Sequence, residues 1–306
     1  TPHPGGIVPT PFHGAWPVML TPFTDDDRVD VDTLDRYVDW LIDSGATGLF
    51  PGALSGEMFE LTEAERLAIA ARVVARAAGR VPVAAAVSER GTAAETAASV
   101  ARLATTGVDL VVLIASVVLQ PDDDESVFTD VVSEVLAANP GVKFGVYECP
   151  LPYHRLFSDD LVAWIAGTGR FLFLKETSHD TEVMATRVRL GADAGLRIFN
   201  AGIEDHVQSL AVGVAGLSGW VVNVAPDLVV ELEELVSQRG EDDRALELQR
   251  VLSSVEDRMG PTYPASAKAI VEARAGIGFT TASRWRPAEV DPDEIRAIVA
   301  MIEAAA

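Results

Sequence analysis

The chain has 306 residues, of which 48% are hydrophobic, and its formal net charge is −22 at pH 7. This length accommodates two small domains or one large α/β unit, and the hydrophobic content is ample for a core. A surface this acidic repels nucleic acids and anionic membranes, so we expect neither as a partner. Acid-rich surfaces commonly serve solubility, so the charge does not identify what the protein binds.

Three features bear on the compartment of the protein. No run of about 18 uncharged apolar residues occurs, which predicts no membrane-spanning helix. The N-terminal segment TPHPGGIVPTPFHG lacks the basic and apolar regions of a secretory signal, and we expect a short loose arm there. Cys149 is the only cysteine, which excludes an internal disulfide framework and indicates a reducing, cytoplasmic location.

The sequence contains no pattern typical of a metal or nucleotide site. No two of its five histidines have ligand spacing on one helix, and there is no CxxC. No GxGxxG follows a predicted strand, and no phosphate-binding GxxxxGKS/T occurs. We therefore expect neither a metal nor a cofactor.

Eight short runs of β-branched or apolar residues are predicted to be strands, with helical periodicity between them. The strands are residues 14–20, 45–52, 81–87, 108–115, 143–149, 171–177, 196–202 and 216–222. Helical segments include 31–42 and 63–77, and the second begins at a capping box formed by Thr62 and Glu65. From about Pro226 to Ala306 only helical patterns remain, and Asp291-Pro292 predicts the start of the last helix.

This alternation predicts an α/β fold, a (β/α)₈ TIM barrel with a C-terminal helical appendage. Residues 1–225 would form the barrel and its short arm, and residues 226–306 a helical region packed on it. A doubly wound open sheet is the alternative architecture. It more often has a glycine-rich turn after its first strand, where this chain has TPFTDDDRV.

Polar and small residues follow several predicted strands at the end where barrel enzymes carry their chemistry. They are Thr21-Pro22, Ser55-Gly56-Glu57, Tyr147, Lys175, Thr177, Gly202, Glu204 and Ser218-Gly219. Each alone has an ordinary structural explanation, such as a turn, a packed ring, or a lysine with a buried stem and a solvated head. Together they bring an amine, a phenol and small hydroxyl groups to one mouth, which predicts an active site.

Lys175 ends the apolar run FLFLK, so we expect its amine to be buried. Burial disfavours the ammonium form, and a neutral amine can attack a ketone to form a Schiff base. The iminium withdraws electrons from the neighbouring carbon, so a bond there can break or form without a metal. A nearby phenol, Tyr147, can carry the protons that these steps require. Backbone N–H groups in a turn of small residues can hold the carboxylate of an α-keto acid.

Five segments in order resemble the dihydrodipicolinate synthase / N-acetylneuraminate lyase family of pyruvate-dependent Schiff-base enzymes. They are VMLTPFTDDDRVD, GALSGEMFELTEAER, VYECP, LKETS and GLSGWVVNV, and the resemblance covers about residues 14–223. Tyr147 and Lys175 stand 28 positions apart, within the spacing usual in that family. The resemblance implies that Lys175 is the Schiff-base lysine and Tyr147 the proton-relay phenol. It also implies a homotetramer and a substrate-binding set of Leu54, Ser55, Gly56, Thr177, Gly202, Glu204 and Ser218.

Several positions depart from the family's pattern. Leu54 stands where a hydroxyl residue usually continues the proton relay, and Val117, Val118 and Leu119 stand where many members lend a tyrosine to a neighbouring subunit. Pro152 replaces the arginine that holds the second substrate of the lysine-biosynthesis enzyme. These departures argue against dihydrodipicolinate synthesis.

Other positions resemble the sialic-acid lyase branch. Thr177 and the segment GIED (202–205) are similar to its sugar-binding parts, although Trp220 stands where that branch has a serine. The mouth is therefore expected to be polar on one side and apolar on the other, where Leu54, Val117, Val118 and Trp220 lie.

The leading hypothesis is a metal-independent lyase that acts on a small α-keto acid through Lys175. Its reaction would be retro-aldol cleavage to pyruvate and an aldehyde, or dehydration of a 2-keto-3-deoxy sugar acid. One alternative is a non-catalytic small-molecule-binding protein with the same fold, because two relay positions are apolar. Another is a pyridoxal-phosphate enzyme with phosphate at GLSG (216–219), although the barrel lysine of that chemistry is usually placed differently.

Overall fold

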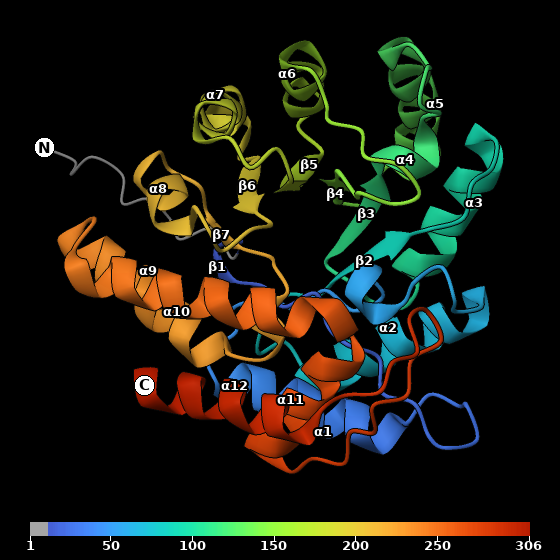
Figure 1. Ribbon diagram of the computed structural model, residues 1–306. Coiled ribbons are helices and arrows are strands. Elements are labelled where there is room, and N and C mark those ends of the chain that lie inside the picture. Colours follow the sequence, from blue (N-terminus) through green and yellow to red (C-terminus); the bar gives the residue numbers. More distant parts are fainter. Residues whose placement is uncertain (1–11) are drawn as a thin grey trace, which may run out of the picture.

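The computed structural model describes residues 12–306, so most of the expected N-terminal arm lies outside the described residues. Seven parallel strands form one curled sheet with helices outside it (Figure 1). The strands are β1 (Gly14–Ala15), β2 (Ala84–Val87), β3 (Leu110–Ile114), β4 (Phe144–Tyr147), β5 (Phe171–Glu176), β6 (Arg197–Asn200) and β7 (Gly216–Leu217). Their order in the sheet is β1-β7-β6-β5-β4-β3-β2.

Residues 47–50 close the sheet between β1 and β2. The Thr47 N–H donates to the Ala15 carbonyl at 3.0 Å, and the Leu49 N–H donates to the Pro82 carbonyl at 3.0 Å. The Ala84 N–H donates to the Leu49 carbonyl at 2.9 Å, and Leu49 forms a parallel bridge with Val83. The predicted (β/α)₈ barrel is therefore confirmed, with the second strand position held by this bridge.

All eight predicted strands are shorter than expected, and three are reduced to two residues or to a single bridge. The segment 45–52 forms only the bridge at Leu49, and the first strand ends at Ala15, ahead of Pro17, which has no N–H to donate to a ladder. The eighth predicted strand ends at Leu217 and is followed by a 3₁₀ turn. Gly216 lies against β1 so closely that a Cβ atom there would be 2.1 Å from the Gly14 carbonyl oxygen, which explains the glycine.

Helices follow the strands as predicted. The barrel helices are α1 (Val31–Asp43), α2 (Glu63–Ala77), α3 (Ala93–Ala104), α4 (Ala115–Val118), α5 (Glu125–Ala138), α6 (Asp159–Gly167), α7 (Thr181–Gly191) and α8 (His206–Ala211). Four 3₁₀ turns are η1 (Leu54–Gly56), η2 (Ala192–Ala194), η3 (Val221–Asn223) and η4 (Gly260–Thr262). The capping box at the start of α2 is present, with Thr62 and Glu65 each bonded to the other's backbone N–H.

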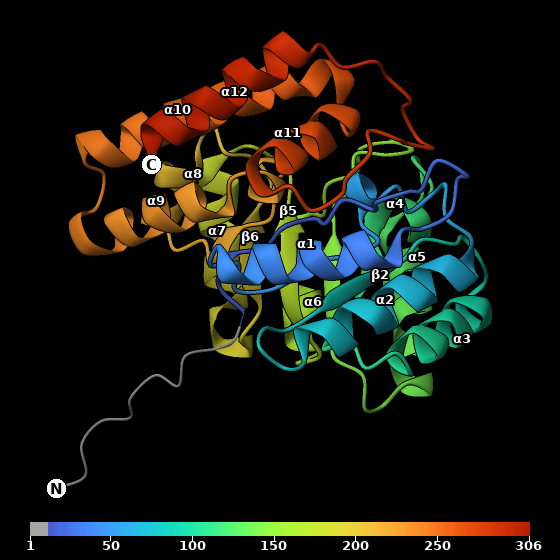
Figure 2. The same cartoon turned by 90° about the horizontal axis from the view of Figure 1, so that it is seen from below.

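The C-terminal region consists of α9 (Pro226–Arg239), α10 (Asp243–Met259), α11 (Ala265–Ala275) and α12 (Pro292–Ala305). The last helix begins as predicted, with Asp291 as N-cap and Pro292 at its first position. Helix α10 packs on α9 and α12, and Figure 2 shows α10, α11 and α12 grouped on one side of the molecule. Within residues 12–306, no helix has the length and apolar character needed to cross a bilayer.

An aromatic cluster fills the barrel interior beneath the strand ends. Trp16 lies 5.2 Å from Phe173 and 5.4 Å from Phe199 between ring centroids, and all three are fully buried. Tyr147 and Leu54 belong to the same apolar cluster. This close packing leaves an apolar surface beneath the strand ends. A charge that projects from it loses hydration and interacts more strongly with neighbouring charges.

Candidate active site

Lys175 and Tyr147 lie side by side on adjacent strands. They are register partners in the pairing of β4 with β5, and the Lys175 Nζ lies 4.7 Å from the centre of the Tyr147 ring. Only 4% of Lys175 and 3% of Tyr147 is exposed. Burial lowers the pKa of Lys175 to about 7, because the ammonium form loses its hydration there. Lys175 can therefore present a neutral amine near neutral pH, as the sequence predicted.

The phenol of Tyr147 has a thiol for its neighbour. Burial holds the pKa of Tyr147 well above its usual value, and the nearby Cys149 thiol acts in the same direction. Leu54 and Val117 are in the apolar cluster around Tyr147, whereas Val118 packs between the sheet and its outer helices. Of the apolar residues expected at this mouth, Leu54 and Val117 therefore lie near Tyr147. The short helix α4 turns Val118 away from it.

A cavity of about 400 Å³ opens above the strand ends. It is lined by Leu54, Tyr147, Pro150, His154, Lys175, Thr177, His179, Ala201, Gly202, Glu204, Trp220 and Glu256. Six residues that the sequence predicted for the site are in this lining, namely Lys175, Tyr147, Leu54, Thr177, Gly202 and Glu204. The lining is apolar at Leu54 and Trp220, as expected, but it contains neither Val117 nor Val118. It is polar at Thr177 and Glu204, as expected, and also at His179, which the sequence did not indicate.

Three other predicted site residues lie behind this lining. The Ser55 hydroxyl accepts a hydrogen bond from the Tyr263 phenol at 2.7 Å. The Gly56 carbonyl accepts from the Thr21 hydroxyl at 2.7 Å. Ser218 donates its N–H to the Asn200 carbonyl at 2.8 Å, and its hydroxyl has no hydrogen-bond partner among the described residues. All three are at most 1% exposed or fully enclosed.

A histidine–carboxylate pair forms the polar wall. His179 Nδ1 lies 2.9 Å from Glu204 Oε1, and this hydrogen bond raises the pKa of His179 and lowers the pKa of Glu204. Gly202 lies directly beneath the pair, since a Cβ atom there would be 2.6 Å from Glu204 Oε2 and 2.7 Å from His179 Cε1. Gly202 thus allows the pair to lie on the backbone at the edge of the cavity.

Thr177 is fixed by two hydrogen bonds. Its hydroxyl donates to the Glu148 carbonyl at 2.8 Å. His154 Nε2 lies 2.8 Å from the hydroxyl oxygen of Thr177. Because the single hydroxyl proton is used on the carbonyl, His154 must donate, which requires a proton on Nε2. The Thr177 oxygen is therefore held in place at the cavity wall.

A fully buried ion network lies behind the two strands. Arg187 binds Glu176 at 2.7 Å and Glu148 at 2.8 Å, and none of the three side chains is more than 1% exposed. Glu148 follows Tyr147 and Glu176 follows Lys175 in the chain, and burial raises the pKa of both carboxyls. Arg187 thus ties the ends of β4 and β5 together directly behind the two central residues.

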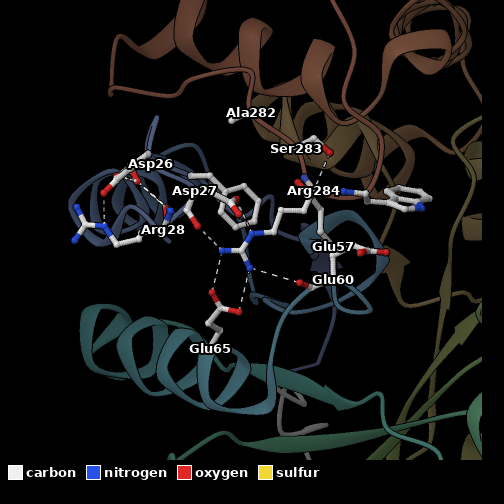
Figure 3. Close-up of polar contacts among 12 residues, drawn as sticks. Asp26, Asp27, Arg28, Glu57, Glu60, Glu65, Ala282, Ser283 and Arg284 are labelled. Carbon is white, nitrogen blue, oxygen red and sulfur yellow. Dashed lines mark hydrogen bonds and ion pairs between the residues drawn. The ribbon is translucent and has the colours of Figure 1, made fainter.

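A second buried pair fastens the C-terminal loop to the turn that carries Ser55 and Gly56. Lys268 binds Glu57 Oε1 at 2.7 Å, with both side chains fully buried. Glu57 Oε2 accepts from the Arg284 N–H at 2.6 Å and the Trp285 N–H at 2.9 Å. Figure 3 shows Arg284 reaching from this loop toward Glu65 and Asp27. We call the contacts of Glu57 with Lys268, Arg284 and Trp285 the Glu57 clasp.

Sequence reasoning missed His154 and His179, which line the cavity after β4 and β5. It also missed two residues of the C-terminal region, Tyr263 and Glu256. Tyr263 stacks on Trp220 with ring centroids 4.2 Å apart and an interplanar angle of 8°. Glu256, on α10, lines the cavity beside Lys175. Neither residue follows a barrel strand, so the rule that directs attention to strand ends gives no signal for them. Within residues 12–306 no three His, Cys, Asp or Glu side chains are grouped to hold a metal ion.

The fold is a barrel with C-terminal helices, and a buried lysine lines the cavity at its strand ends. The chain belongs to the dihydrodipicolinate synthetase family, whose model matches residues 11–304. It is 31% identical over 300 residues to an uncharacterized DapA-like lyase of Halobacterium salinarum, covering 97% of this chain and 94% of that protein. It is 27% identical to the 4-hydroxy-tetrahydrodipicolinate synthase of Methanothrix thermoacetophila, covering 72% and 73% of the two chains.

Solved structures share the fold at lower identity. The Ruminococcus gnavus sialic acid aldolase has a TM-score of 0.86 at 19% identity, covering 97% of this chain and 98% of that chain. A dihydrodipicolinate synthase of Bacillus anthracis has a TM-score of 0.84 at 21% identity, covering 96% and 98%. The shared fold extends over both the barrel and the C-terminal helices.

Proposed function

We propose that the protein is a Schiff-base lyase that acts on an α-keto acid through Lys175 without a metal. The observation that carries this proposal is the buried amine of Lys175, with a pKa of about 7, against the Tyr147 ring in a cavity of about 400 Å³. A lysine kept desolvated in a cavity rather than paired with a carboxylate is suited to nucleophilic attack.

The chemistry begins when the neutral amine attacks the keto carbon and a carbinolamine forms. Loss of water gives the iminium, and the Tyr147 phenol assists by moving a proton between nitrogen and the departing hydroxyl. The iminium then accepts the electrons of the adjacent bond. Breaking C3–C4 releases an aldehyde. In dehydration a C3 proton is removed instead, which gives the enamine, and the enamine electrons then expel the C4 hydroxyl group of the 3-deoxy sugar acid as water.

The cavity wall suits a hydroxylated rather than a doubly anionic substrate. Its polar side consists of Thr177, His179 and Glu204, while its lining among the described residues contains no arginine. Pro152 is exposed and supplies no cation for a second carboxylate. We therefore infer that the enzyme does not condense pyruvate with aspartate semialdehyde efficiently.

The remaining predicted residues have supporting roles in this proposal. The turn of Leu54, Ser55 and Gly56 would bind the carboxylate of the keto acid through the backbone N–H groups of Leu54 and Ser55, with the backbone around Ser218 closing the pocket. The N–H groups of Gly56 and Ser218 already donate to the Ala53 and Asn200 carbonyls. Residues 226–306 would act as a helical region that packs on the barrel and completes the cavity. We also propose a cytoplasmic homotetramer, by family resemblance and from the single cysteine; sedimentation of the purified protein would test the assembly.

A substrate panel tests the proposed function. The purified protein should release pyruvate from a 4-hydroxy-2-keto acid, or convert a 2-keto-3-deoxy sugar acid to its dehydrated product, with both products resolved by mass. Aspartate semialdehyde with pyruvate is the third arm and should give little product. Rapid turnover in that arm, near the typical enzyme rate of about 10 per second, would reverse the exclusion of dihydrodipicolinate synthesis.

A further inference from the structure

Glu256 occupies the boundary between two cavities. It lines the cavity that contains Lys175 and Tyr147, and it also lines a neighbouring cavity of about 480 Å³. The two cavities share Glu204, Trp220 and Glu256. Glu256 projects from α10, near the C-terminal end of that helix, so it approaches the cavity from the side opposite the barrel floor. A substrate bound at Lys175 would extend toward this carboxyl.

The carboxyl of Glu256 is held in place but not neutralised. Its Oε1 accepts the Val221 N–H at 2.8 Å, which fixes the side chain against η3. The other acidic groups near the site have cations: Glu204 pairs with His179, Glu148 and Glu176 with Arg187, and Glu57 with Lys268. Among residues 12–306, no lysine, arginine or histidine forms an ion pair with Glu256. Burial raises the pKa of Glu256 to about 8.

The surroundings of Tyr147 leave a role open for a second proton carrier. Leu54 and Val117, in the same apolar cluster, carry no hydroxyl, and the other polar hydrogen in that cluster close to the phenol is on the Cys149 thiol. Burial raises the pKa of that thiol, so it is a poor carrier. Tyr147 can serve the nitrogen beside it, but among residues 12–306 no hydrogen bond joins its phenol to another side-chain hydroxyl group.

We propose that Glu256 carries the proton to and from the substrate carbon and its departing oxygen, in place of the missing relay. This inference rests on the proposed Schiff-base function. It assigns catalysis to a residue of the C-terminal helical region, which would then contribute chemistry as well as shape to the site.

In the proposed cycle, Glu256 returns to the substrate each proton that it takes. Formation of the iminium places a positive charge at Lys175 Nζ, which favours the carboxylate of Glu256. In retro-aldol cleavage the carboxylate takes the proton of the C4 hydroxyl, the C3–C4 electrons move to the iminium, and an enamine and an aldehyde result. Glu256, now protonated, gives its proton to C3 of the enamine and restores the iminium. With pyruvate alone, the same carboxylate removes a methyl proton and returns one.

The pH dependence of this carrier involves every charged group that faces it. Lys175 projects from β5, His179 and Glu204 lie at the cavity wall, and Asp257 is its neighbour on α10. The charge of Lys175 favours the carboxylate, and the charge of Glu204 opposes it. Replacement of Glu256 by glutamine keeps an oxygen for the Val221 N–H and removes only the exchangeable acid.

Exchange of the pyruvate methyl protons with D₂O, followed by NMR, tests the inference without knowledge of the second substrate. We expect Glu256→Gln to slow exchange by about 10²–10⁴-fold, the usual worth of a general acid or base. The wild type should show a pH limb near 8, and Glu256→Gln should lack it. Glu247→Gln, which removes an exposed carboxylate of the same helix that lines neither cavity, should exchange at the wild-type rate.

Borohydride trapping of pyruvate on each variant separates this inference from the proposed function. Adduct formation in both the wild type and Glu256→Gln, with slow exchange only in the latter, supports the inference. Normal exchange in a Glu256→Gln variant that forms the adduct overturns the inference and leaves the proposed function intact. Absence of an adduct in the wild type overturns both.

Discussion

Tyr147 and Lys175 are direct register partners on β4 and β5, and the lysine amine lies 4.7 Å from the centre of the tyrosine ring. Because the two side chains come from opposed positions of a parallel pair, the sheet itself fixes their separation. Arg187 holds the residues that follow each of them, Glu148 and Glu176, from behind. The backbone geometry thus fixes the position of Lys175 relative to Tyr147, and both side chains are buried in the barrel core.

The first prediction concerns the protonation of Lys175. Since its pKa is about 7, the neutral fraction should rise through pH 7 and level off by about pH 8, some 3 units below an ordinary lysine. Competitive labelling with a small amine reagent, read on separate peptides, measures this fraction. The exposed Lys143, labelled in the same sample, is the internal reference for the reagent. A Lys175 labelling curve that coincides with that of Lys143 would contradict the burial argument.

A second prediction concerns the stability cost of Lys175. The pKa is about 7 in the folded chain and higher in the unfolded chain, so the unfolded state binds more protons between these values. Stability of the wild type should therefore rise as the pH increases from 7 toward 10. Lys175→Met should increase the free energy of unfolding at pH 7 by about 1–4 kcal/mol, and this gain should shrink toward pH 10. Denaturant unfolding at both pH values measures it, and a less stable variant at pH 7 would count against a desolvated amine.

Tyr147 should matter for turnover far more than for folding. Tyr147→Phe keeps the ring that packs against Phe50, with centroids 6.3 Å apart, but removes the phenol beside Lys175. We expect turnover to fall by about 10²–10⁴-fold while the melting temperature changes little. Steady-state kinetics on the substrate found in the panel, with chemistry rate-limiting, measures this. Near-normal turnover would mean that Tyr147 only packs.

The Glu57 clasp should dominate the attachment of the C-terminal loop. Glu57→Gln leaves the buried Lys268 ammonium without its counter-charge, so we expect a loss of about 3–5 kcal/mol of unfolding free energy. Asp27→Asn removes the exposed partner of Arg284 at the edge of the same set (Figure 3) and should have no measurable effect. Equal losses in the two variants would show that burial does not govern this contact.

The sequence was informative wherever a local pattern determines structure. The helical periodicity and the runs of β-branched residues predict the barrel, and the apolar run before Lys175 predicts that its amine is buried. The predicted second strand, residues 45–52, is longer than the single bridge at Leu49 in the structure. The hydrogen bonding of this segment depends on closure of the whole sheet, which no local pattern reveals. Val118 was assigned to the mouth because α4 was not foreseen, and one helical turn moves the side chain to the opposite side.

Tertiary packing accounts for what the sequence did not reveal about the site. Glu256 stands 81 positions after Lys175, on a helix whose own pattern is only amphipathic, and nothing local indicates that it faces the cavity. Ser55 was expected to face the substrate, yet its hydroxyl is bonded to Tyr263, a residue about two hundred positions away. Both facts depend on how the C-terminal helices lie on the barrel.

The central claim is that Lys175 forms the covalent intermediate, and trapping with pyruvate and borohydride tests it most directly. The chain contains only three lysines, Lys143, Lys175 and Lys268, so peptide mapping is unambiguous. The account predicts one pyruvate-derived adduct, on the peptide that contains Lys175, which disappears in Lys175→Met and persists in Lys143→Arg. An adduct on Lys143 or Lys268, or one that persists in Lys175→Met, would contradict the account.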